Sequence, residues 1–238
     1  MPLTDENRSI VKTGIRRIQD APRPGIAALL KAAGLSKKEI ASSDIAFSVC
    51  PRINATGRME HAAKAVELLV CSDPQKADFT AEQLNINNTH RQEIEQEIYE
   101  DVIRQLSEEP ALAKKRVIVV AGKGYHQGVV GIVASRIMEK YEKPAVIIGV
   151  DDEGNARGSA RSISGFNIFE VVCACSDLLS HFGGHPGAAG LSLNAADIDL
   201  FRNRINAFAA EKYPVMPVQT VGIDFKISPL YLSVDLAK

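Results

Sequence analysis

Apolar residues in the first third of the chain recur at spacings of three and four, which predicts a series of helices. The stop signals of proline and glycine divide the series. Helices are expected over residues 7–20, 25–33, 36–41 and 58–71. Residues 51–58 carry proline, asparagine and glycine between two arginines, so we expect a turn-rich segment there.

A much longer helical pattern runs from Ser72 as far as Pro110. Ser72 and Gln75 have the spacing of a capping box, and Pro74 suits the first turn. About 33 residues with a rise of 1.5 Å each give a helix of roughly 50 Å. Its middle, residues 85–92, is strongly polar, which favours a rod between two domains. An ordinary amphipathic helix of one bundle is the alternative.

Beyond Arg116 the pattern changes to short apolar runs that are typical of buried strands. Runs at 117–121 and 145–150 flank a helix predicted over 128–141, so these strands should be parallel with a right-handed crossover. The later elements expected are a hairpin turn at 151–155, a strand over 156–162, a helix over 165–180, a strand from 191–193, a helix over 195–213 capped by Asn194, and a strand over 220–227. The predicted fold class is α/β, with an N-terminal helical segment, a long connecting helix and a domain with a mixed sheet.

Composition narrows the classes of function. The 238 residues are 45% hydrophobic and 24% charged with a formal net charge of −1, so a nucleic-acid site must be a local patch. Aromatic residues make up 5% with no tryptophan, which argues against a stacking platform for many bases. Four irregularly spaced cysteines are typical of reduced thiols. With no signal peptide and no long apolar run, we expect a cytoplasmic protein that binds no membrane.

Four segments combine glycine, arginine, serine or histidine beside predicted strand ends: residues 52–58, 122–128, 157–162 and 183–190. Arginine forks match phosphate oxygens, hydroxyls and loop amides add donors, and glycine lets the backbone approach a ligand. Each segment alone could be a solvated strand face or a tight turn. Together they favour a groove for an anion or a nucleic acid.

Two other kinds of site fit less well. The pattern Gly122-x-Gly-x-x-x-Gly128 lies between strand and helix, but it is one residue longer than the dinucleotide fingerprint, and the next strand enters a hairpin. The five histidines do not pair with acids at metal-ligand spacing, so no metal site is expected in this chain.

Taken together, these residues resemble the RecJ family of single-strand-specific 5′-to-3′ exonucleases, within the DHH phosphoesterase superfamily. The segments that carry the resemblance are Arg52–Arg58, His126–Arg136, Gly158–Ser162 and Gly183–Gly190, in this order and on either side of the long helix. Two departures are Tyr125, where the family often has tryptophan, and Ala160, where glycine is common. Neither removes a polar contact.

The resemblance implies a domain organisation. Residues 1–72 would be the helical end of the DHH catalytic core, 73–110 the connecting helix, 111–228 the DHH-associated domain and 229–238 the start of a further domain. The family holds Mn²⁺ or Mg²⁺ on an N-terminal domain whose Asp-His-His motif does not occur here. This chain alone is therefore predicted to bind no metal, to carry no catalytic residue and to be inactive.

The resemblance also implies a partner and a site. Single-stranded DNA would bind this chain, with a helicase or single-strand-binding protein as further candidate partners. Carried over by position, Ser159, Arg161 and Arg58 would hold the 5′-terminal phosphate. His185 with Gly183 and Gly184 would face the scissile region, and His126 would line the same cleft. A phosphodiesterase for short oligonucleotides or cyclic dinucleotides, and a non-catalytic nucleic-acid-binding module, are the alternatives.

Overall fold

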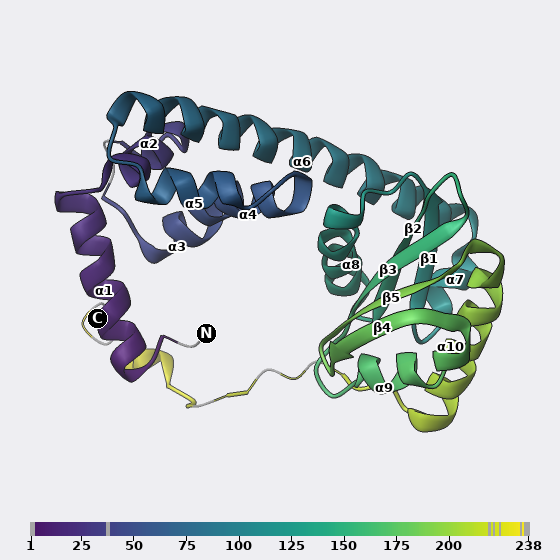
Figure 1. The fold of residues 1–238 in the computed structure, drawn as a ribbon. Helices are drawn as coiled ribbons and strands as arrows, with labels where there is room; N and C mark the ends of the chain where they lie inside the picture. The colour runs from purple at the N-terminus through teal and green to yellow at the C-terminus, as the bar shows by residue number, and fades with distance from the viewer. Residues whose placement is uncertain are drawn as a thin grey trace.

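One long helix, α6 (Pro74–Glu108), joins a helical region to an α/β region in the computed structural model (Figure 1). The structure describes residues 3–36, 39–218, 220, 222–223, 225–233 and 235. The 35 residues of α6 confirm the predicted long helix, which at 1.5 Å per residue is about 52 Å long. Its N-cap is Asp73 rather than the expected Ser72, because the Asp73 carboxylate accepts from the amides of Gln75 and Lys76.

Five α-helices of the described chain precede α6 in the helical region. They are α1 (Asp5–Asp20), α2 (Pro24–Ala32), α3 (Ser42–Asp44), α4 (Cys50–Met59) and α5 (Ala63–Val70). Leu29, Leu68 and Leu84 form the fully buried centre of this core. Apolar side chains at helical spacing bury one face of α2 and of α5, as the sequence pattern predicted, whereas α1 and α3 have no buried residue.

The turn-rich segment expected at 51–58 is wrong, because these residues form α4. Pro51 lies in the first turn, where its missing amide costs nothing. The Arg52 guanidinium anchors the helix by donating to Asn85 Oδ1 at 2.9 Å and to the Ser48 carbonyl at 2.6 Å. Arg52 therefore has a structural role in this fold.

Two other expectations in this region need correction. A single helix over 58–71 is wrong, because the backbone leaves the helical region at Glu60 (φ −143°) and α5 starts afresh at Ala63. This break allows the end of α4 to contact α8 while α5 packs on α2. The helix expected at 36–41 is not formed at residues 36 and 39–41, and residues 37–38 lie outside the described chain.

The α/β region is built on a five-stranded mixed sheet of order β1-β2-β3-β5-β4. The strands are β1 (Ile118–Lys123), β2 (Ala145–Val150), β3 (Asn155–Arg161), β4 (Leu179–His185) and β5 (Ala188–Asn194). Strands β1 and β2 are parallel, and the other pairs are antiparallel. The crossover helix between the parallel pair is α8 (Gln127–Tyr141), which confirms the predicted βαβ unit.

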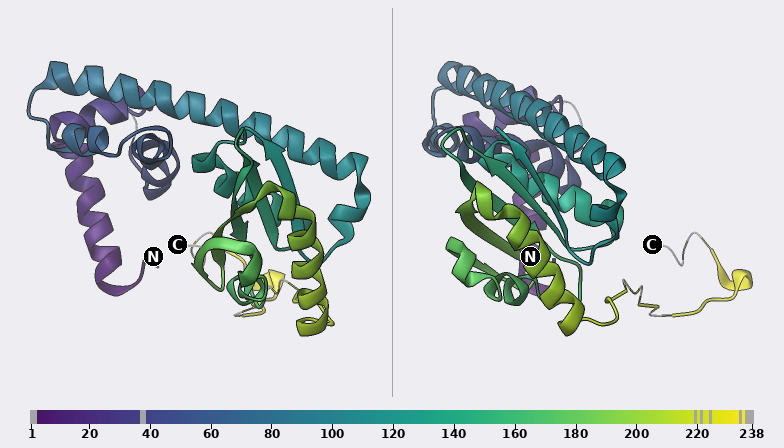
Figure 2. Two further views of the ribbon diagram at one scale, coloured as in Figure 1. Left: turned by 45° about the vertical axis from the view of Figure 1, so that its right-hand side comes forward. Right: turned by 90° about the vertical axis from the view of Figure 1, so that its right-hand side faces the viewer.

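Helices cover the two faces of the sheet unequally. On one face, α9 (Ile168–Cys173) and α10 (Ile198–Lys212) pack on buried apolar residues of β1, β2, β3 and β5. Phe201 of α10 is fully buried there. On the other face, α8 and the second half of α6 pack on β1 and β2 (Figures 1 and 2). No residue of β3, β4 or β5 belongs to this second buried cluster, so far as the chain is described.

The glycine-rich segment is part of a β-hairpin, although a turn was expected. The helix expected at 165–180 is limited to α9 and a 3₁₀ turn, Ser176–Leu178, after which β4 begins. Strand β4 lies at the sheet edge and is held by its ladder with β5. Asn194 caps a short 3₁₀ turn before α10. Residues 220, 222–223 and 225–227 of the strand expected at 220–227 belong to no strand, and 221 and 224 lie outside the described residues.

Candidate nucleic-acid interface

The register of the sheet brings polar side chains together on its uncovered face. In a strand, alternate residues share a face, and directly paired residues of neighbouring strands point the same way. Ala156 and Ala160 of β3 are buried towards α9 and α10, so the alternate residues Arg157, Ser159 and Arg161 point to the α8 side. Three sets of paired residues follow across β3, β5 and β4: the Arg157 row (Arg157, Ser192, His181), the Ser159 row (Ser159, Gly190, Gly183) and the Arg161 row (Arg161, Ala188, His185).

This face is open because α8 packs over β2 and β3 and does not extend over β5 and β4. Arg157, His181, Gly183, His185 and Gly190 are all exposed. A hollow of about 530 Å³ lies over it, lined by Gln127, Arg157, Gly158, His181, Phe182, Gly183, Gly190, Leu191 and Ser192. A Cβ built on Gly183 or Gly190 would meet nothing within 4 Å, so the middle of the face is a floor of bare backbone.

Ser159 and Arg161 lie on the same open face next to α8, and Arg58 approaches Arg161 from the end of α4. The Arg161 Nη1 atom donates to Ser159 Oγ and to the Ala160 carbonyl, both at 2.8 Å. A Cβ on Gly131 of α8 would lie 2.9 Å from Arg161 Nη2 and 3.0 Å from Ser159 Oγ, so any larger residue there would displace these side-chain ends. Arg58, at the end of α4, donates to the Gly128 carbonyl at 3.0 Å. Residues far apart in sequence thus form one cationic corner.

The electrostatics of this corner favour an anion. Burial lowers the pKa of Arg161, and the nearby positive charge of Arg58 lowers it further. Within the described residues Arg161 makes no ion pair, and Asp152 pairs instead with Lys123 at 2.9 Å. A phosphate between the two guanidinium groups would relieve their repulsion and match their fork geometry.

Two histidines present the same ring nitrogen outward. His126 is the N-cap of α8, and its Nδ1 accepts from the Gly128 amide at 3.1 Å. His185 Nδ1 accepts from the Gly187 amide at 3.2 Å. In the neutral ring, Nε2 then carries the proton and can donate to a ligand oxygen.

The predicted site residues are therefore not equally placed. Ser159 and Arg161 are hydrogen-bonded, Arg58 is near enough for its charge to act on Arg161, and Gly183 and His185 share the open face with Ser159 and Arg161. His126 lies at the start of α8, next to Gln127, whose amide donates to the Gly149 carbonyl beside Arg157. Gly184 points to the other face, where a Cβ would lie 2.3 Å from the Ala188 carbonyl oxygen.

Sequence reasoning did not assign Arg157, His181, Ser192 and Gln127 to the site. Arg157 is at a same-face spacing from Ser159 and Arg161, which was a usable signal. His181 and Ser192 gave no such signal, because their place on the face depends on the pairing of β4 with β5.

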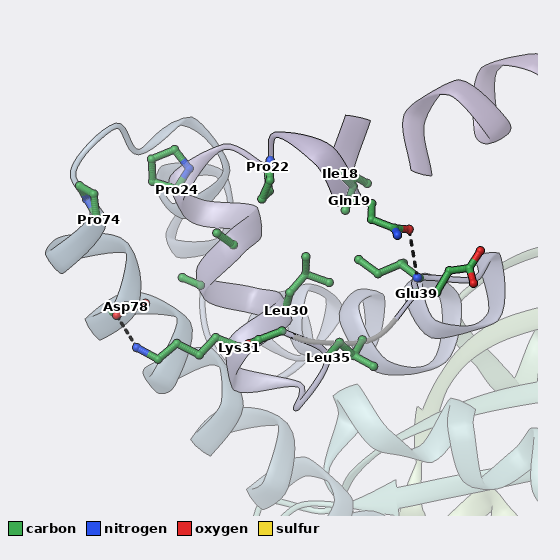
Figure 3. Close-up of a pocket in the computed structure, with 14 residues that line it drawn as sticks. Ile18, Gln19, Pro22, Pro24, Leu30, Lys31, Leu35, Glu39, Pro74 and Asp78 are labelled. Atoms are coloured by element: carbon green, nitrogen blue, oxygen red, sulfur yellow. Dashed lines mark hydrogen bonds and ion pairs between the residues drawn. The ribbon is translucent and has the colours of Figure 1, made fainter. Parts of the chain in front are cut away.

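Other parts of the described chain carry less chemistry. No three His, Cys, Asp or Glu side chains gather among the described residues in a way that could hold a metal ion. None of the described helices has the length and apolar character needed to cross a membrane. A cavity of about 640 Å³ opens in the helical region between α2 and the start of α6, with Lys31 and Asp78 paired at 2.6 Å on its wall (Figure 3). None of the predicted site residues lines it.

Comparisons with known proteins place these features in context. Residues 114–211 match the family model of the DHHA1 domain. The single-stranded-DNA-specific exonuclease RecJ of Bacillus subtilis (strain 168) is 39% identical over 227 residues, which are 94% of this chain and 29% of that protein.

Two solved structures have the same fold over most of this chain. The crystal structure of RecJ in complex with Mg²⁺ from Thermus thermophilus has a TM-score of 0.75 at 32% identity, over 89% of this chain and 32% of that one. The crystal structure of exonuclease RecJ bound to manganese has a TM-score of 0.75 at 33% identity, over 88% of this chain and 51% of that one. The chain thus spans between 29% and 51% of these three relatives.

Proposed function

Because this chain is a homologue of RecJ exonucleases over part of their length and carries a DHHA1 domain, we propose that it forms the strand-holding part of a 5′-to-3′ exonuclease acting on single-stranded DNA. In this role the open face of β3, β5 and β4 binds the strand end. Arg58, Ser159 and Arg161 hold the terminal 5′-phosphate, and His185, in the same row as Arg161, faces the first nucleotide.

One observation carries this proposal: the cationic corner has a shape and charge suited to a terminal phosphate. A terminal phosphate has one more ionisable oxygen than an internal one, so it gains more from two guanidinium groups and a hydroxyl. The bare backbone beside it, at Gly183 and Gly190, leaves room for the sugar and base. The α8 N-terminus adds its partial positive charge.

In this proposal, the hydrolysis step depends on residues outside this chain. Phosphodiester cleavage by this family would need metal ions that activate water, and related structures contain Mg²⁺ or manganese. The described residues do not offer a fitting donor set. We therefore propose that the metal ions belong to a part of the enzyme outside this chain, and that this chain supplies substrate binding.

The test compares short oligothymidylates with a 5′-phosphate or a 5′-hydroxyl, labelled at the 3′ end and followed by fluorescence anisotropy. A charge-assisted contact is worth roughly 1.5 to 3 kcal/mol, or about 10- to 150-fold in affinity. Arg161→Ala should therefore remove most of the preference for the 5′-phosphate. Arg161→Lys should restore part of it, because lysine keeps the charge and loses the fork.

Lys115→Ala is the matched control, since it removes an exposed positive charge near β1, at the opposite edge of the sheet from β4. Its preference should equal that of the unmodified chain. If Arg161→Ala keeps the full preference for the 5′-phosphate, the corner is not the terminal-phosphate site.

A further inference from the structure

The Arg157 row repeats the chemistry of the Arg161 row at the other end of the same face. Each row pairs an arginine on β3 with a histidine on β4 across a small residue of β5, Ser192 in one and Ala188 in the other. The glycines of the Ser159 row lie between them. The open face of the sheet therefore carries two Arg–His pairs, and the two glycines between them, Gly190 and Gly183, have no side chains.

The groups of the Arg157 row are free to bind. In the described structure the Arg157 guanidinium and the His181 ring have no hydrogen-bond partner and no ion pair within 4 Å. Both side chains are exposed and line the hollow of about 530 Å³ with Ser192 and Gln127. Hydrogen bonds from Asn155 are the main cause that lowers the pKa of Asp151, and the charge of Arg157 lowers it further. The Asp151 carboxylate accepts from Asn155 Nδ2 at 3.0 Å. A guanidinium, an imidazole, a hydroxyl and an amide facing one hollow offer several hydrogen-bond donors to an oxyanion.

The spacing of the rows selects the kind of oxyanion. Arg157 is two residues from Ser159 and four from Arg161, and a strand rises about 3.3 Å per residue, so Arg157 lies about 7 Å along the strand from the nearer residue of the terminal-phosphate site and about 13 Å from the farther one. One or two nucleotide steps of an extended single strand span these distances, which are longer than the separation of directly linked phosphates in a polyphosphate.

We propose that Arg157 and His181, with Ser192 and Gln127, bind an internucleotide phosphate of the strand whose terminal phosphate is held at Ser159 and Arg161. This inference rests on the proposed function. The DNA strand then passes over Gly183 and Gly190 between the two sites, with its sugar–phosphate backbone close to Gly190. The site makes no base-specific demand, because phosphate contacts carry no sequence information.

Competition by ligands of increasing length distinguishes this site from the terminal-phosphate site. Thymidine 5′-monophosphate, its 5′-phosphorylated dimer, trimer and tetramer, and thymidine 5′-triphosphate would compete with a labelled strand on the 238-residue chain. Arg157→Ala and His181→Ala should each weaken binding about three- to tenfold, beginning at the dimer or trimer, and leave the monophosphate unchanged. For the longer strands Arg157→Ala should make the slope of log affinity against log salt shallower by about 0.7, because one positive charge is removed. Arg161→Ala should weaken every phosphorylated ligand, including the monophosphate.

Gly190→Ala provides a second variant that should fold normally, since its Cβ would meet nothing within 4 Å. It should weaken the dimer and longer strands while leaving the melting temperature unchanged. Lys115→Ala, with the same change of charge as Arg157→Ala, should follow the unmodified chain at every length.

Three results would overturn the inference. Equal loss at the monophosphate would assign Arg157 to the terminal-phosphate site, a loss specific to the triphosphate would make it a polyphosphate site, and no loss at any length would make it a solvated surface. Failure of the proposed function gives a different pattern: Arg161→Ala would leave the monophosphate and the 5′-phosphate preference unaffected.

Discussion

At the scale of single residues, the candidate site depends on side chains that are missing as much as on those present. Gly131 leaves the space in which the Arg161 guanidinium and the Ser159 hydroxyl meet. Gly122 has a similar role, since a Cβ there would lie 2.0 Å from the Tyr125 ring. These glycines allow helix, strand and loop to approach one another closely.

Tyr125 fixes the loop that leads into His126 and α8. Its hydroxyl donates to Asp101 of α6 and accepts from Gln105 Nε2 at 3.0 Å. Burial, together with the Asp101 carboxylate, raises the pKa of Tyr125, so the phenol is protonated and able to donate at neutral pH. The Tyr125 hydrogen bond is the main cause that lowers the pKa of Asp101.

Tyr125→Phe should lower the free energy of unfolding by about 1 to 2 kcal/mol at pH 7. The pKa of Asp101 is lowered by folding, so its stabilisation is present above the ordinary aspartate pKa of 3.8 and is lost as pH falls through the folded value. The difference between the two chains should therefore be full at pH 7 and shrink below about pH 4. Urea unfolding at both pH values measures it. Tyr141→Phe is the control, and a constant difference at all pH values would contradict this account.

At the scale of elements, the polar middle of α6 is the joint between the two regions. There α6 contacts both α4 and α8, so Asn88 and Arg91 are buried within the polar stretch that the sequence analysis took as the middle of a rod between two domains. Glu95 accepts from Arg91 at 2.6 Å and from Arg136 of α8 at 3.0 Å. The Arg136 guanidinium also lies 3.8 Å from the centre of the Tyr99 ring. One carboxylate thus ties α8, which carries the site wall, to the long helix.

Glu95→Ala should destabilise the chain by about 2 to 4 kcal/mol, because it leaves Arg91 buried without its charge partner. Arg91 Nε already has no hydrogen-bond partner in the described structure, so little else compensates. Thermal or urea unfolding measures the loss. Glu97→Ala, on an exposed position of the same helix, should change stability by no more than about 0.5 kcal/mol. Equal effects of the two substitutions would show that the joint does not depend on Glu95.

At the scale of the whole molecule, the site forms where the two regions meet. Arg58 comes from the helical region, whereas Ser159 and Arg161 come from the sheet, and α8 lies between them (Figure 1). A displacement of one region against the other would separate Arg58 from Arg161. In the proposed function the length of α6 would therefore matter to binding as well as to shape.

We expect this chain by itself to release no nucleotides from single-stranded DNA in the presence of Mn²⁺. Its described residues offer no group of three metal ligands, and the proposed chemistry needs metal-activated water. Purified protein incubated with 5′-labelled single strands tests this. Nucleotide release that follows the protein peak through chromatography would contradict the prediction, whereas strand binding without release would agree with it.

The sequence by itself determined the elements whose signal is local. The spacing of apolar residues predicted α6, the parallel β1–α8–β2 unit and the mixed sheet, because each of these elements buries a periodic apolar face. It also marked Ser159 and Arg161 as neighbours on one side of a strand. The same reasoning placed Arg157 within reach of them without assigning it a role.

Only the tertiary structure decided which residues share the groove. Strand β4 has no apolar periodicity, so its glycines and histidines become a strand face only through the ladder with β5. The segment at 51–58 is helical because α6 and the Ser48 carbonyl anchor Arg52, and this places Arg58 beside α8. The Arg52–Asn85 and Arg58–Gly128 contacts join residues 33 and 70 positions apart, and the ladder of β4 depends on β5 being held in the sheet by β3. Local propensity cannot encode them, because their free energy comes from pairing and packing that exist only once the chain has folded.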